Sequence, residues 1–287
     1  MRALSRTQRG WIIVREVGRE AVGCLFGRRR TRQIVDEEYD RGWWALTLAE
    51  RRWRDWGDLG AFLDGVGGRM RLATIDNELV MISDAEYYRF RARMLARVVE
   101  ECAMTREVVE LGCGWGRNLF TLWRTGQWRH LVGLDVSANA VAAGRAIAAH
   151  FGCDGLEFDL LDVTDGSAPN FARLRDRTVL TYYCLEQLPR AVSAVVENIR
   201  RAAPKRVIHV EPTTELLRLW SPRDLVNYLY IVRQDYQRSL LRILRAAERS
   251  ERIRVVDVRR LFYAPSMRHD PVLACWDPLP APEETRG

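Results

Sequence analysis

A glycine-rich loop directly follows a run of β-branched residues at positions 108–118, which read VVELGCGWGRN. Gly112, Gly114 and Gly116 stand at alternate positions in it. Because glycine loses more conformational entropy on folding than any other residue, such a cluster indicates a backbone that turns tightly or passes close to a ligand. A buried strand that ends in such a loop favours an α/β fold, in which ligands bind at the carboxyl ends of the strands.

Strand-like and helical segments alternate along the rest of the chain. Strands are predicted at 107–111, 130–135, 155–161, 178–183 and 206–211, and helices at about 117–126, 138–150, 168–175 and after Pro189. Two further strand-like runs, 252–258 and 271–276, have no helix between them, so the last strand is expected to be antiparallel. The pattern predicts a doubly wound, mainly parallel sheet with helices on both faces.

The first 82 residues differ in composition from the remainder. They hold arginine clusters and the tryptophan-rich stretch RGWWALTLAERRWRDW at 41–56, whose apolar residues recur at helical spacing. We therefore expect an N-terminal helical subdomain at 1–82 that packs on the main domain or covers a ligand pocket. Ser83 and Glu86 form a capping box that predicts a helix start, and the main domain is placed at 83–287.

Two segments of the main domain are expected to have roles of their own. The helical region 214–250 is longer than a crossover needs, and we expect it to help form a substrate pocket. The final stretch, PLPAPEETRG at 278–287, is expected to be mobile.

The net charge of +7 comes almost entirely from arginine, since Lys205 is the only lysine. This bias indicates genome composition more than a nucleic-acid site, although a basic surface also suits anionic partners. The six cysteines form no C-x-x-C pair, so no zinc or other metal site is predicted and free thiols are expected. No apolar run is long enough to span a membrane. We expect a cytoplasmic protein, and a homodimer is one candidate for its oligomeric state.

The spacing of the loop narrows the choice of ligand. A dinucleotide fingerprint needs a third glycine where Arg117 stands, and a phosphate-binding P-loop needs a Gly-Lys-Ser/Thr sequence that is absent. Asp135 closes the second strand, where it can accept both hydroxyls of a ribose, and Asp162 closes the third, where it can meet an adenine amino group. Glu110 can meet a cationic amino group. These groups suit a ligand with a ribose, an adenine and an amino acid.

The order VELGCGWG, GLDVS, FDLLD, TYYCLEQLP and RVIHVEP resembles the class I S-adenosylmethionine-dependent methyltransferases over residues 84–212. The resemblance implies a Rossmann-like, seven-stranded sheet with an antiparallel last strand, and S-adenosylmethionine as cofactor. It further implies which residues line the cofactor: Glu110, Gly112, Cys113, Gly114, Gly116 and Asn118 at the methionine part, Asp135 and Val136 at the ribose, Asp162 and Val163 at the adenine, and Tyr182 and Gln187 near the sulfonium.

The segment Leu185–Leu188 stands where many small-molecule members of the family read Leu-Glu-His followed by Leu or Ile. Gln187 replaces that histidine, and an amide cannot act as a base. The catalytic candidates are therefore Glu186, Tyr183 and His269. His209 is expected to be a core or strand-edge histidine, and Arg233 is a candidate to pair an acidic group of the substrate.

The expected activity is methyl transfer to a small-molecule or modified-peptide acceptor, at oxygen. The alternative is a nucleic-acid (RNA) methyltransferase, which the basic charge allows. The amino-methylating signature Asn/Asp-Pro-Pro-Tyr/Phe is replaced by Thr-Tyr-Tyr-Cys, which disfavours that alternative. A non-catalytic cofactor-binding scaffold and a dehydrogenase are further options, and the intact first motif and its spacing disfavour them.

Overall fold

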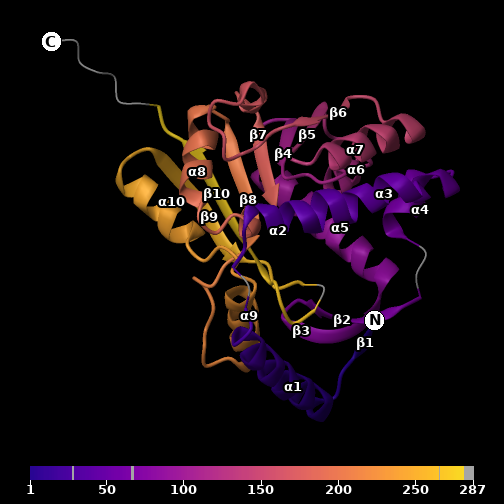
Figure 1. Cartoon of the computed structure of the whole chain (residues 1–287), viewed down its shortest axis with the longest axis vertical. Coiled ribbons are helices and arrows are strands. Elements are labelled where there is room, and N and C mark those ends of the chain that lie inside the picture. Colours follow the sequence, from indigo (N-terminus) through magenta and orange to yellow (C-terminus); the bar gives the residue numbers. More distant parts are fainter. Residues whose placement is uncertain (28, 66–67, 265, 281–287) are drawn as a thin grey trace.

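A seven-stranded sheet lies at the centre of the molecule (Figure 1), in a computed structural model that describes residues 1–27, 29–65, 68–264 and 266–280. The strand order is β6-β5-β4-β7-β8-β10-β9. The strands are β4 (Glu107–Leu111), β5 (His130–Asp135), β6 (Leu156–Leu160), β7 (Thr178–Tyr182), β8 (Arg206–Pro212), β9 (Ile253–Arg260) and β10 (Pro271–Pro278). β10 pairs antiparallel with both β8 and β9, and the strand pairs from β6 to β8 are parallel. The predicted fold class is therefore confirmed; residues 281–287 of the expected mobile tail lie outside the described residues.

The inner strands β4, β5, β7, β8 and β10 bury side chains on both of their faces. Val108 packs into one apolar layer with the helices α5 and α7, and Val109 packs into the other with α8 and α10. The bounds of these helices are α5 (Asp84–Cys102), α6 (Arg117–Trp123), α7 (Ala138–Phe151), α8 (Val192–Arg201) and α10 (Leu240–Arg249), with a 3-10 turn, η3 (Pro169–Leu174). Because successive strand residues point to opposite faces, helices must cover both sides of the sheet.

The N-terminal region contains the expected helices and also strands that were not expected. Its elements are β1 (Arg2–Ala3), α1 (Arg6–Cys24), α2 (Arg32–Val35), the π-helix η1 (Asp36–Trp44), α3 (Ala45–Glu50), η2 (Arg52–Asp55), α4 (Leu59–Asp64), β2 (Met70–Ile75) and β3 (Glu78–Ser83). The helical assignment of residues 70–82 is wrong. Asp76 and Asn77 both adopt positive φ, which closes β2 and β3 into a tight hairpin.

The region 214–250 is less helical than expected. Residues 214–221 form turns, and α9 (Pro222–Arg233) begins with Pro222 in its first turn. α10 belongs to the layer that covers the sheet, since Leu240, Leu241 and Leu244 lie in its core. α9 instead packs against α1 at one end of the molecule, beside the β2–β3 hairpin (Figure 1). Within the described part of the chain, no helix is both long and apolar enough to cross a bilayer.

Candidate functional site

The strand order reverses between β4 and β7, so the loops that follow these two strands meet at one edge of the sheet. Gly112, with φ of 66°, lies so close to the second loop that a Cβ on it would be 2.3 Å from Sγ of Cys184. A Cβ on Gly114, with φ of 54°, would be 2.8 Å from the ring of Trp44. At both positions a Cβ would clash and φ is positive, so glycine lets the loop pack closely against these neighbouring side chains.

Glu110 is buried beneath the glycine loop with one oxygen unpaired. Its Oε1 accepts a hydrogen bond of 2.6 Å from the Asn118 amide, and burial raises the pKa of the carboxyl to about 8. Among the described residues, none hydrogen-bonds to its Oε2. Since an unpaired buried carboxylate oxygen is costly, this arrangement fits a ligand that brings an amino group.

Arg91 of α5 completes this network and was not predicted from the sequence. Its Nη2 donates to Oδ1 of Asn118 at 3.0 Å, and its Nε donates to the Tyr182 hydroxyl at 2.9 Å. A signal was present, because Arg91 stands midway between Tyr87 and Leu95 on the apolar face of the helix. A charged residue inside such a stripe indicates a buried polar partner.

Asp135 is the last residue of β5, and its carboxylate holds the glycine loop through a hydrogen bond. Its Oδ2 accepts from the Gly114 N–H at 2.7 Å and its Oδ1 from the Ser137 N–H at 2.9 Å. Burial raises the pKa of Asp135 even though these hydrogen bonds favour the charged form. A carboxylate has about four acceptor positions, so capacity remains for ligand hydroxyls.

Asp162, Val136 and Val163 lie along the same edge of the sheet. Val136 is 54% exposed next to Asp135, whereas Val163 is buried and its carbonyl accepts from Asn198. The Asp162 carboxylate pairs with Arg32 at 2.7 Å. Burial opposes ionisation of Asp162, but hydrogen bonds from Thr164 and Arg32 prevail and lower its pKa. A ligand at this edge would therefore meet the ionised carboxylate of Asp162 and the exposed apolar side chain of Val136.

Residues 30–44, which we call the N-terminal strap, cross this edge of the sheet. Three side chains attach the strap: Arg32 pairs with Asp162, Asp40 accepts hydrogen bonds at the start of α7 from the Ser137 hydroxyl and the Asn139 N–H, and Trp44 lies against Gly114. The strap therefore covers the same residues that the sequence assigns to cofactor binding.

The structure brings the three predicted catalytic candidates together. His269 Nε2 lies 3.1 Å from Glu186 Oε2, and the Tyr183 hydroxyl donates to the carbonyl of His269 at 2.7 Å. The rings of Tyr230 and Tyr236 contact the imidazole with centroids 4.7 and 5.2 Å away. Tyr183 and Glu186 share the loop after β7, whereas His269 comes from a distant segment and meets them only in the fold.

Gln187 and Tyr182 flank this group on different sides. Gln187 Nε2 donates to Glu186 Oε1 at 2.6 Å and to the Tyr39 hydroxyl of the strap at 3.3 Å. The Tyr182 hydroxyl instead bonds to Arg91 and to the Tyr263 hydroxyl at 2.9 Å each. Gln187 is therefore hydrogen-bonded to the catalytic candidate Glu186. Tyr182 is instead part of the hydrogen-bond network of Glu110, Asn118 and Arg91 below the glycine loop.

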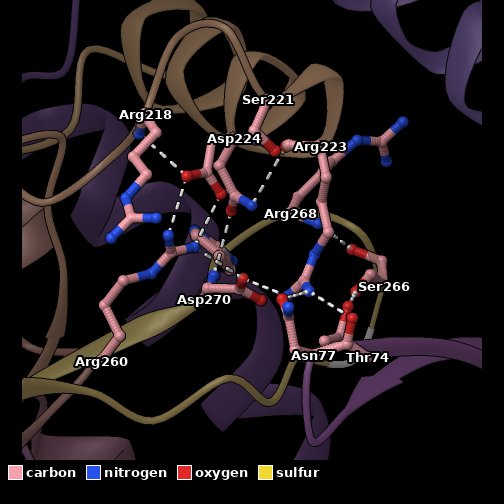
Figure 2. Close-up of polar contacts among 12 residues, drawn as sticks. Thr74, Asn77, Arg218, Ser221, Arg223, Asp224, Arg260, Ser266, Arg268 and Asp270 are labelled. Atoms are coloured by element: carbon pink, nitrogen blue, oxygen red, sulfur yellow. Dashed lines mark hydrogen bonds and ion pairs between the residues drawn. The ribbon is translucent and has the colours of Figure 1, made fainter.

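A buried ionic network fixes the loop that carries His269 (Figure 2). Asp270, 3% exposed, pairs with Arg223 of α9 and with Arg260 of β9, and Arg260 also pairs with Asp224 at 2.7 Å. His269 itself has a φ of 68°, which side-chain-bearing residues rarely adopt. The network and the Tyr183 hydrogen bond hold this conformation in place.

The structure contradicts the predicted role of Arg233 and confirms that of His209. Arg233 Nε lies 2.8 Å from Oε2 of the fully buried Glu20 in α1, so it forms an internal ion pair. His209 is buried within the sheet, where Nδ1 pairs with the Thr181 hydroxyl and Nε2 accepts from the Trp276 indole at 2.9 Å. Burial lowers the pKa of His209 to about 3, which keeps it neutral.

Comparisons with known proteins agree with this architecture. Residues 108–206 match a family model described as a methyltransferase domain. No curated protein sequence matches the chain significantly. Magnesium protoporphyrin IX methyltransferase from Synechocystis PCC 6803 is 13% identical, with 86% of this chain and 100% of that chain covered and a TM-score of 0.52.

Two further solved structures have comparable similarity. The pyocyanin biosynthetic protein PhzM is 14% identical, with 68% of this chain and 57% of that chain covered and a TM-score of 0.51. The (4+2)-cyclase SpnF is 13% identical, with 68% and 84% covered and a TM-score of 0.50. At such identities the likeness shows the fold alone, so the acceptor must be argued from the site.

The matched domain, the ordered motifs and the strand order agree with one another. Residues 108–206 therefore form a methyltransferase domain within a sheet of the class I fold, and the methyl donor of this enzyme is S-adenosylmethionine.

Proposed function

We propose that this methyltransferase transfers the methyl group to an oxygen of a small-molecule or modified-peptide acceptor. The observation that carries the proposal is the Glu186–His269 pair beside the loop after β7. A hydroxyl is a weak nucleophile until it loses its proton, so a positioned base accelerates its reaction. A carboxylate facing an imidazole holds the ring and stabilises the imidazolium that forms when the ring takes a proton.

Each residue of this group has a distinct role in the proposal. His269 takes the proton from the acceptor hydroxyl, and Glu186 orients the imidazole through Nε2. Tyr183 is a positioning residue, because its hydroxyl is engaged by the His269 carbonyl and burial raises its pKa well above the usual range. Glu211 positions the loop, since its carboxyl accepts the N–H groups of Cys184 and Leu185 at 2.9 and 3.1 Å.

The residues at the sheet edge fit the cofactor in the proposed assignment. Bound S-adenosylmethionine supplies a methyl group already activated by a sulfonium leaving group, so the chain contributes mainly orientation and proton removal. Glu110 would bind the amino group through its unpaired oxygen, and Asp135 the ribose hydroxyls. Asp162 would bind the adenine amino group. Further contacts would come from Cys113, Gly114, Gly116, Asn118, Val136, Val163, Tyr182 and Gln187.

Cofactor binding is expected to release a proton from Glu110. The Glu110 carboxyl, with its pKa of about 8, is protonated in the free protein at neutral pH, but an ammonium ligand selects its charged form. At about pH 6.5, where the cofactor's own α-amino group is already charged, binding should release close to one proton. Affinity should rise by about tenfold per pH unit up to about pH 8, and it should fall again at higher pH as the α-amino group of the cofactor loses its proton.

Calorimetry in buffers of different ionisation enthalpy measures this release. Glu110→Gln keeps the hydrogen bond from Asn118 through its amide oxygen, so the variant should bind more weakly and without proton release. Equal release by the wild type and the variant would contradict the assignment of Glu110.

The proposed function is tested with labelled S-adenosylmethionine and a size-fractionated lysate. Label in the small-molecule or peptide fraction, on oxygen by mass spectrometry, would support the proposal. Label in RNA would overturn it in favour of a nucleic-acid acceptor, for which binding should fall steeply with salt.

A further inference from the structure

Arg30 of the N-terminal strap is a buried arginine, and one edge of its guanidinium, formed by Nε and Nη2, has no hydrogen-bond partner among the described residues. It is 8% exposed, and its Nη1 lies 2.6 Å from a carboxylate oxygen of Glu38. Its Nε and Nη2 are buried and hydrogen-bond to none of the residues that the structure describes. The backbone is fixed on both sides, because the Arg30 N–H donates to Asp235 at 2.8 Å and its carbonyl accepts from Arg190 at 3.0 Å.

The two unpaired nitrogens have the geometry of a binding edge. Nε–H and Nη2–H are parallel and point the same way, which is the arrangement that binds both oxygens of a carboxylate. Leaving two donors of a charged group buried and unpaired is costly. Such an edge therefore indicates a missing anionic partner rather than a packing contact.

The surroundings of this edge connect it to the proposed catalytic pair. The guanidinium carbon lies 5.9 Å from the centroid of the Tyr39 ring and 5.6 Å from that of Tyr236. Tyr236 stacks on His269, with 12° between the ring planes, and Tyr39 accepts from Gln187. The buried Gln187 Oε1, which hydrogen-bonds to none of the described residues, belongs to the same group. A molecule held by Arg30 would thus lie between aromatic walls beside Glu186.

The other arginines near Glu186 and His269 already form ion pairs with carboxylates of the protein. Arg233 and Arg268 pair with the buried Glu20, and Arg190 pairs with Asp235 at 2.7 Å. Glu38 pairs with Arg30, and burial together with the charges of Glu186 and Glu38 raises the pKa of the neighbouring Tyr39 hydroxyl. A single open cationic edge in surroundings that already hold these carboxylates matches a monoanion better than a phosphate dianion.

We propose that Arg30 binds the carboxylate of the methyl acceptor, and that the acceptor is a planar, aromatic carboxylic acid. The assignment rests on the proposed function, because it places the carboxylate of the acceptor in the site that holds Glu186 and His269. It replaces the anion-binding role that the sequence suggested for Arg233. The aromatic rings of Tyr39 and Tyr236 select a flat acceptor, and the guanidinium edge fixes its orientation.

Benzoate and its neutral counterpart benzamide are the probes that test this site. Binding is measured by ligand-observed NMR and calorimetry on the full chain with S-adenosylhomocysteine present. Benzoate should bind the wild type roughly ten- to hundredfold more tightly than benzamide, the range expected for hydrogen bonds to a charged group. Arg30→Gln should remove this difference, and Arg30→Lys should keep only part of it, because an ammonium lacks the planar fork.

Arg41→Gln is the matched control, since Arg41 lies on the same strap with its side chain 73% exposed. It should leave the preference for benzoate unchanged. Thermal unfolding and S-adenosylhomocysteine binding of Arg30→Gln show whether the variant is folded. If that variant is unfolded, the Arg30→Lys result decides: benzoate and benzamide bound with wild-type preference would overturn the proposal.

The remaining outcomes separate this inference from the proposed function. Equal binding of the two probes by the wild type, no benzoate binding, or benzoate binding that survives Arg30→Gln overturns the carboxylate site and leaves methyl transfer to oxygen standing. Arg30-dependent benzoate binding supports the site even if the labelled methyl group is found only on RNA, which would overturn the proposed function alone.

Discussion

Replacing His269 with alanine should lower kcat by about 10²- to 10⁴-fold, the usual contribution of a positioned general base. Affinity for S-adenosylmethionine should be unchanged, because His269 contacts Glu186, Tyr230 and Tyr236 rather than the glycine loop. The measurement is single-turnover methyl transfer with labelled cofactor and the acceptor identified from the lysate.

Two further variants make this result specific. Glu186→Gln retains the shape of the pair but cannot stabilise an imidazolium, so kcat should also fall. His130→Ala removes a histidine that pairs with Glu157 away from the site and should have no effect. A wild-type kcat in His269→Ala would exclude His269 as the base and would favour an acceptor that needs no deprotonation.

Asp135→Ala should weaken S-adenosylmethionine binding by roughly a hundredfold or more, if each hydrogen bond from the ribose to this carboxylate contributes about 1.5–3 kcal/mol. The substitution also removes the acceptor of the Gly114 and Ser137 N–H groups, so the glycine loop itself should loosen. Calorimetry measures the affinity, and thermal unfolding without cofactor measures the stability.

The two effects of Asp135→Ala are separated by companion variants. Asp135→Asn keeps an oxygen for one backbone N–H and should restore much of the stability but less of the affinity. Asp165→Ala removes an exposed aspartate whose side chain, among the described residues, hydrogen-bonds to Ser167 alone, and it should change neither quantity. Unchanged affinity in Asp135→Ala would contradict the ribose assignment.

The sheet and the cofactor edge could be predicted because their signals are local in the sequence. The run of Val108 and Val109 predicts a strand buried on both faces, and Gly112 and Gly114 stand where backbone must meet another loop. The capping box of Ser83 and Glu86 fixed the start of α5 in the same way. Patterns of this kind need only a few neighbouring residues.

The hairpin at 70–83 and the acceptor side could not be predicted in the same way. The hairpin turns at Asp76 and Asn77, a pair without glycine, and its strands are stabilised by contacts elsewhere in the fold. Arg30 is one arginine in a chain rich in arginine, and only its burial in the fold distinguishes it. The pairing of His269 with Glu186 depends on a loop closed by residues far away in the sequence.

The network around that loop joins segments that lie far apart in the chain. Arg268 pairs with Glu16, 252 residues earlier in the chain, whereas each strand of the parallel sheet pairs with segments much closer in sequence. Contacts of such long range form late in folding, and the N-terminal part of a chain emerges first from the ribosome. Glu16 and Glu20 therefore lack their partner Arg268 until nearly the whole chain has emerged. The strands that carry the proposed cofactor edge can therefore pair before the loop of His269, the proposed base, is held in place.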